Sequence, residues 1–157
     1  VQGFVEMFPG VGTQVTSVNP EDISKILPPL GVLQALAAEL AAPVISQETI
    51  NILRDINHKF AKALIAGDTF TALKQDEKFH NIIIDLAQNP YISNTASMLQ
   101  AHVMRLYYNK TIILKERSIE EHEDILKAFE QKDREKAGHI ARVNWLRAID
   151  EYYSEEK

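Results

Sequence analysis

The sequence of 157 residues contains no cysteine and has no excess of positive charge. Without cysteine, disulfide scaffolds and thiolate metal sites are excluded, and a reducing cytoplasm is a compatible compartment. The formal net charge is −5 and the pI is about 5.5. Because binding to phosphates needs a basic surface, we do not expect this chain by itself to bind nucleic acid.

Long hydrophobic runs are also missing. We see no apolar stretch long enough to span a bilayer, and no charged segment followed by an apolar one that would predict a signal peptide. Apolar residues make up 45% of the chain and charged residues 25%, which is ordinary for a soluble globular protein. We therefore expect one soluble, cytoplasmic domain without a membrane partner.

What the sequence does contain is a helical period of apolar residues from Leu30 onward. The joints between the helices are short, so consecutive helices should pack antiparallel. The predicted fold class is all-α, an antiparallel bundle of about six to seven helices preceded by a short β-hairpin. The expected helices cover residues 20–27, 30–43, 46–67, 68–88, 91–117, 119–131 and 133–153.

Local signals set several of these boundaries. Pro28 and Pro29 are expected to break the chain between the first two helices. Ser118 and Glu121 form a capping-box pattern that predicts the start of the helix of residues 119–131. In the helix of residues 30–43, the expected core stripe consists of Leu33, Leu36, Ala37 and Leu40.

The first residues follow a different pattern. Apolar side chains alternate or cluster around a Pro-Gly pair in GFVEMFPGVGTQV, residues 3–15. This pattern predicts the hairpin, two short strands joined by a tight turn.

Polar side chains occupy core positions in three of the expected helices. Asp76 and His80 lie one turn apart on one buried face, and His122 and Asn144 take the middle of two later stripes. Burying these groups is costly unless each finds a partner, so we expect them to meet. They could hold a divalent metal, or they could form a metal-free hydrogen-bond network; the spacing leaves both interpretations open.

A second polar ribbon, His102, Arg105 and Asn109, runs beside the core stripe of the helix of residues 91–117. It is either a solvated edge or one wall of a polar cavity, where Arg105 would hold a carboxylate. His58 and His139 lie off the stripes and are expected on the surface. Enzyme templates fit poorly, because the sequence has no second Glu-x-x-His motif, no phosphate-binding loop that opens a helix and no nucleophile elbow.

The opening GFVEMFPGVGTQV resembles the wing of the winged-helix DNA-binding domain of GntR-type bacterial regulators. The helical part resembles the FadR-like C-terminal (FCD) domain, the effector-binding half of one GntR subfamily. The resemblance divides the chain into a wing remnant (1–18), a linker (19–29) and an FCD domain (30–157). The stretches that carry it are LQALAAELAA (33–42), DEKFH (76–80), EHEDILKAFEQKD (121–133) and AGHIARVNW (137–145).

The resemblance implies a helical bundle that dimerises and binds a divalent metal, often zinc or nickel, through one Asp and three His. A small carboxylate effector can join that metal. By position, Asp76, His80 and His122 match the Asp and the first two His. The third His falls on Asn144, whose amide oxygen is a weaker donor for zinc-like ions, so a harder ion such as manganese would be tolerated.

The resemblance also bears on the effector. Arg105, with His102 and Asn109 nearby, is the expected contact for the effector carboxylate. Leu30 and Gln34 stand where family members commonly carry Arg and Glu, so an effector or dimer contact is expected to differ there.

These features predict that the chain is the ligand-sensing and dimerisation domain of a transcription regulator. The regulator is expected to be a homodimer and to bind DNA only through a winged-helix part. If residues 3–17 are a wing, the chain is a piece of a longer protein. Two other functions stay open at this point: a metal-dependent enzyme that acts on small organic acids through the same Asp/His cluster, and a structural bundle whose polar core fixes helix register.

Overall fold

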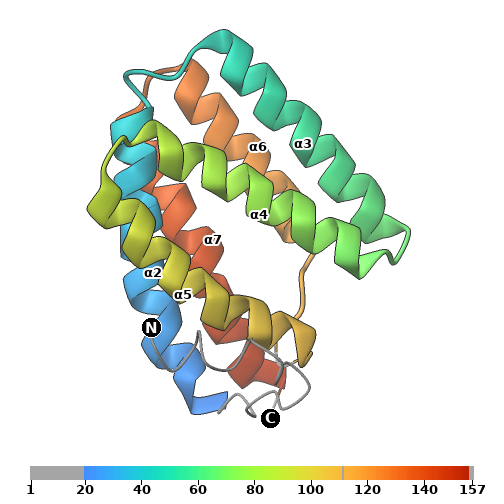
Figure 1. Ribbon diagram of the computed structural model, residues 1–157. Coiled ribbons are helices and arrows are strands. Elements are labelled where there is room, and N and C mark those ends of the chain that lie inside the picture. Colours follow the sequence, from blue (N-terminus) through green and yellow to red (C-terminus); the bar gives the residue numbers. More distant parts are fainter. Residues whose placement is uncertain (1–19, 111, 156–157) are drawn as a thin grey trace, which may run out of the picture.

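The computed structural model describes residues 20–110 and 112–155, and in this part of the chain all regular elements are helices (Figure 1). The all-α prediction is therefore confirmed, while the predicted hairpin of residues 3–17 lies outside the described residues. A short 3₁₀ helix comes first, followed by α-helices: η1 (Pro20–Asp22), α2 (Ile23–Ala41), α3 (Gln47–Ile65), α4 (Thr69–Leu86), α5 (Pro90–Tyr108), α6 (Arg117–Glu130) and α7 (Arg134–Glu155).

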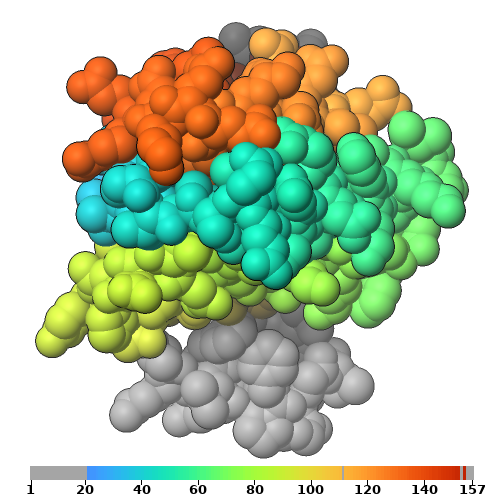
Figure 2. Space-filling view, turned by 90° about the horizontal axis from the view of Figure 1, so that it is seen from above, coloured from blue at the N-terminus to red at the C-terminus, as the bar shows by residue number. Residues whose placement is uncertain are grey.

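Helix α2 is the centre of the bundle. It packs along most of α7 and also contacts α5 and α4. Gly31 of α2 lies against Leu146, and Gly138 of α7 lies against Glu39, so the two helices run antiparallel. Helix α3 packs on α4 and α6, and Figure 2 shows its segment between the orange C-terminal helices and the yellow-green ones.

The predicted helix break at Pro28 and Pro29 is wrong, because both prolines lie inside the continuous helix α2. A proline in a helix interior removes a backbone hydrogen bond and costs about 3 kcal/mol. The burial on both sides offsets this cost, since Ile23, Leu27 and Leu30 are all completely buried. Residues 23–29, predicted as part of a linker, therefore form the first turns of α2.

The core stripe predicted for this helix is also wrong in part. Leu36 is 40% exposed, whereas Gln34 is only 1% exposed. The face that enters the core contains Leu27, Leu30, Gln34, Ala37, Ala38 and Ala41. The spacing of the leucines predicted the wrong buried face, because α7 packs closely on α2 where the side chains are small, at the alanines and Gly31.

Contrary to the sequence-based expectation, one helix meets the length and composition of a membrane span. Helix α2 has a mean hydropathy of 1.2 over 18 residues. In the structure one face of α2 packs against α4, α5 and α7, so much of this apolar composition is explained by its place in the core.

The segment between α5 and α6 differs from the prediction of one long helix over residues 91–117. Helix α5 ends at Tyr108, and Lys110 has a left-handed φ of 57°. Ile113 is 57% exposed, while Leu114 is buried against a small cluster around Phe60. A continued helix would have placed different side chains in that cluster.

The capping box predicted at Ser118 is wrong, because α6 begins at Arg117 and no side chain caps it. Three other helices do have side-chain caps: the side chains of Ser46, Asp68 and Asp133 accept hydrogen bonds from the backbone amides of Thr49, Thr71 and Lys136.

Candidate metal centre

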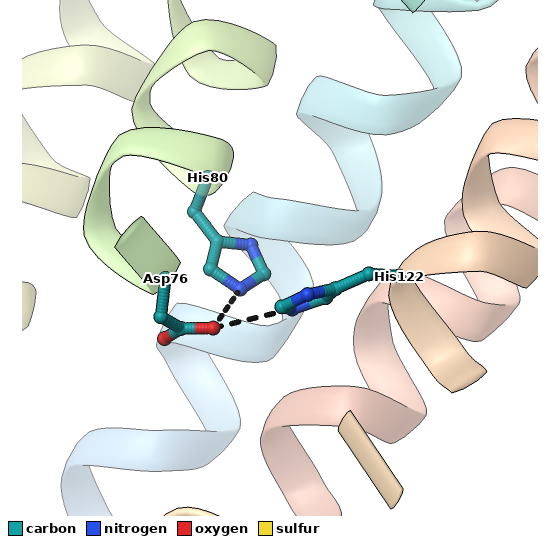
Figure 3. Close-up of side chains that lie close together, drawn as sticks. All are labelled: Asp76, His80 and His122. Carbon is teal, nitrogen blue, oxygen red and sulfur yellow. Dashed lines mark ion pairs between the residues drawn. The ribbon is translucent and has the colours of Figure 1, made fainter. Parts of the chain in front are cut away.

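Asp76, His80 and His122 meet in the interior of the bundle (Figure 3). Asp76 and His80 come from neighbouring turns of α4, and His122 reaches them from α6. The Asp76 Oδ1 atom lies 3.3 Å from His80 Nε2 and 3.1 Å from His122 Nε2. The three residues are 8%, 2% and 0% exposed, as their core positions in the sequence predicted.

Asn57 of α3 fixes the orientation and tautomer of His122. Its Nδ2 donates to the backbone oxygen of Ile119 at 3.1 Å, so its Oδ1 is the atom that faces His122 Nδ1, at 2.9 Å. An amide oxygen only accepts, and Nδ1 must therefore carry a proton. The ring is also held by Phe79, stacked at 4.2 Å between centroids.

This tautomer leaves His122 Nε2 with a lone pair that points toward another acceptor, the Asp76 carboxylate. Among the described residues, Nε2 has no hydrogen-bond partner that satisfies it. Two acceptors at 3.1 Å repel each other unless a proton or a cation lies with them. Ligand atoms bound at about 2.1 Å to a tetrahedral ion are about 3.4 Å apart, so the observed spacings fit a divalent cation.

The electrostatics favour the protonation states that a metal requires. Burial alone raises the pKa of Asp76, but the neighbouring His80 and His122 outweigh this effect, and the pKa lies below its usual value. Burial lowers the pKa of His122 more than Asp76 raises it. An ionised Asp76 and a neutral His122 are the metal-binding forms.

Asn144 lies beside this group but has a partner of its own. Its Nδ2 donates to Glu121 Oε1 at 2.8 Å, and Asn144 lines the same cavity of about 20 Å³ as Asp76 and His80. Whether its Oδ1 ligates a metal stays a prediction.

A charged network adjoins the site on the side of α7. Arg147 donates to both carboxylate oxygens of Glu121, to Ser118 and, at 2.5 Å, to Glu151. Burial raises the pKa of Glu121, but the hydrogen bonds from Arg147 and Asn144 outweigh it and lower that pKa. The residues predicted as a capping box, Ser118 and Glu121, thus serve to hold Arg147.

Two aromatic residues complete the walls. Tyr107 of α5 and Trp145 of α7 line the 20 Å³ cavity and a second one of about 10 Å³, and both cavities also contact Asp76 and His80. Trp145 packs on His80 with ring centroids 4.9 Å apart.

The predicted effector contacts lie elsewhere on α5. Arg105 donates to His102 Nδ1, and His102 lies near Asp22 at the start of α2, which partly offsets the lowering of its pKa by burial and by Arg105. Asn109 is exposed at the C-cap of α5. None of the three lines the two cavities beside Asp76; their role stays a prediction. His58 and His139 are exposed, as expected.

Sequence reasoning missed Asn57, Tyr107, Trp145 and Arg147. Signals for two of them were present: Asn57 shares a helix face with Leu53 and Phe60, and Arg147 follows Asn144 by three residues. The sequence gives no such signal for Tyr107 and Trp145. An aromatic residue at a core position is common, so it does not stand out as a polar residue does.

Comparison with known families matches residues 30–144 to the FCD domain. The chain belongs to the FCD-domain family. The resemblance of the helical part to the FCD domain is thereby confirmed, and it identifies the chain as part of a regulator and not an enzyme.

A solved structure, E. coli McbR/YncC, is similar with a TM-score of 0.75 over 91% of this chain and 69% of that chain. At 20% identity this likeness shows the shared fold. The search of curated proteins found no match.

Proposed function

We propose that this FCD domain is the ligand-sensing part of a cytoplasmic GntR-type transcription regulator, and that it senses a small carboxylate at a divalent metal. The observation that carries the proposal is the buried Asp76 carboxylate facing two histidine Nε2 atoms, one of them held as a lone-pair donor by Asn57. In this proposal Asp76, His80 and His122 hold the ion, and Asn144 completes the set.

The charges around the cavity explain why the metal would precede the effector. Asp76 carries one negative charge, and the group of Glu121, Glu151 and Arg147 carries one more in sum. An anionic ligand is repelled by this surplus, whereas a divalent ion cancels it. A carboxylate should therefore bind only to the metal-loaded protein.

The position of the site also supports a sensory role. The cavity beside Asp76 is lined by α2, α4, α5, α6 and α7 together. One lining residue, Leu27, lies near the start of α2, the helix through which the chain continues toward its N-terminal residues. A ligand that favours one position of Leu27 over another would shift the segment that leads to a DNA-binding part. Such a difference in affinity between two conformations is what allostery needs.

We further propose that the regulator acts as a homodimer. Val32 and Leu36 are 50% and 40% exposed and stand one turn apart on the outer face of α2. Paired exposed apolar side chains on a central helix are a natural contact for a second copy.

The function is tested by metal analysis and thermal unfolding of the full chain. Protein stripped with a chelator should gain stability on addition of Zn²⁺, Ni²⁺ or Mn²⁺, and a panel of small carboxylates should add to it only after the metal. Asp76→Asn and His122→Gln should lose the response to metal, while His139→Gln, at an exposed position, should keep it. A chain that binds no divalent ion and no carboxylate would contradict the proposal.

A further inference from the structure

The only tryptophan of the chain, Trp145, has an unmet hydrogen-bond donor beside the proposed metal site. Its side chain is 7% exposed and packs on His80. Within residues 20–110 and 112–155, its Nε1 atom has no acceptor. Buried indole N–H groups normally donate a hydrogen bond, so this N–H group is available to an oxygen atom of a bound ligand.

Tyr107 supplies a second donor beside the same cavities. It comes from α5, and it lines the same two cavities as Trp145. A phenol hydroxyl is protonated near neutral pH and can donate its proton to a ligand oxygen.

The available space shows how these donors relate to a ligand. The two cavities measure about 20 and 10 Å³, enough for an ion or one water molecule but not for an organic acid. Both are bounded by Asp76, His80, Tyr107 and Trp145. An organic ligand therefore needs the two cavities to merge, and it then contacts Trp145 and Tyr107, which line both of them.

We propose that Trp145 and Tyr107 determine ligand specificity by donating hydrogen bonds, and that they select a small carboxylate carrying a further hydroxyl or keto oxygen. The proposal rests on the proposed function. One carboxylate oxygen binds the metal and the other accepts from one of the two donors. The second donor then has a hydrogen-bond acceptor only if the ligand carries a hydroxyl or keto oxygen. When a plain carboxylate binds, the second donor stays buried without a hydrogen bond.

The test compares two acids that differ by one oxygen, propanoate and 2-hydroxypropanoate. Calorimetric titration of the full chain saturated with Zn²⁺, and in parallel with Mn²⁺, should show binding of the hydroxy acid tighter by on the order of tenfold. Tyr107→Phe and Trp145→Phe should each reduce this preference several-fold, because each removes a donor that the hydroxy acid uses and so weakens its binding more than that of propanoate. Tyr91→Phe, a change on the same helix at a residue that is 83% exposed, should alter neither affinity.

Trp145 also gives a direct signal, because all indole fluorescence comes from this residue. The emission of the wild type and of Tyr107→Phe should shift when the hydroxy acid binds. If Trp145→Phe does not fold, the Tyr107→Phe titration and this emission still decide the matter. Equal affinity of the wild type for both acids, or an equal loss for both acids in the variants, overturns the specificity role and leaves the proposed function standing. A wild type that binds neither metal nor acid overturns both.

Discussion

The Oδ1 atom of Asn57 lies 2.9 Å from the Nδ1 atom of His122 and determines which ring nitrogen of that histidine faces Asp76. Asn57 is 2% exposed and is itself oriented by the backbone oxygen of Ile119. It is therefore a positioning residue for the proposed metal ligand.

Removing Asn57 is expected to weaken metal binding without removing a ligand. In Asn57→Ala, His122 is free to adopt either tautomer and to rotate. We expect the metal affinity to fall by about 10- to 100-fold, as for other groups that orient a ligating histidine. Competition with a chelator of known affinity measures this. Asn51→Ala, at an exposed position on the same helix, should have no effect; an unchanged affinity in Asn57→Ala would show that the tautomer is fixed by other contacts.

Replacing Asn144 by histidine is expected to change the metal preference. Imidazole nitrogen is a better ligand for zinc and nickel than an amide oxygen, whereas manganese gains little from the exchange. The affinity of Asn144→His for Zn²⁺ should therefore rise by tenfold or more, and the ratio of zinc to manganese affinity should rise with it. Equal effects on both ions would mean that residue 144 does not contact the metal.

The sequence predicted the cluster of Asp76, His80 and His122 because each of them breaks an apolar stripe, a local signal that a single helix already carries. It did not predict the path through Pro28 and Pro29, because the burial of Ile23 and Leu27 against other helices overrides local propensity there. The sequence pattern of Ser118 and Glu121 predicted a helix cap, whereas both side chains bind Arg147. That contact could not be predicted, because it depends on how α6 packs on α7.

Arg147 should contribute strongly to stability because its partner Glu121 is buried. Their side chains are 14% and 11% exposed. Arg147→Met leaves the carboxylate of Glu121 without its main partner, and we expect a loss of about 3 kcal/mol in the free energy of unfolding. Adding Glu121→Gln should recover much of that loss. Denaturant unfolding measures both.

A matched control is available in Arg54, which pairs with Glu123 and Glu130 nearer the surface, with its side chain 26% exposed. Arg54→Met should cost less than about 1 kcal/mol. Similar losses for Arg54→Met and Arg147→Met would contradict a special role for the buried pair.

A charge on the outer face of α2 is expected to separate the proposed dimer. Leu36→Glu places a carboxylate in the apolar pair of Val32 and Leu36, where burial against a second copy would be costly. Sedimentation should show a dimer for the wild type and a monomer for this variant. Ile65→Glu, at a residue 72% exposed near the end of α3, should remain dimeric. A dimer that persists in Leu36→Glu would place the interface on another face.

The pH dependence of stability in the metal-free protein should report on His122. Burial holds its folded pKa below that of an unfolded histidine, about 6.5. As the pH falls through that value, the unfolded chain takes up a proton at His122 while the folded chain does not, so stability declines, by at most about 1.4 kcal/mol per pH unit. The lowered pKa values of Asp76 and Glu121 extend the decline in stability below about pH 4.

Urea unfolding between pH 5 and 8 with a chelator present measures this dependence. The slope of the free energy of unfolding against pH should be shallower for His122→Gln than for the wild type, and unchanged for His139→Gln. Identical slopes in all three proteins would mean that His122 is charged in the folded state.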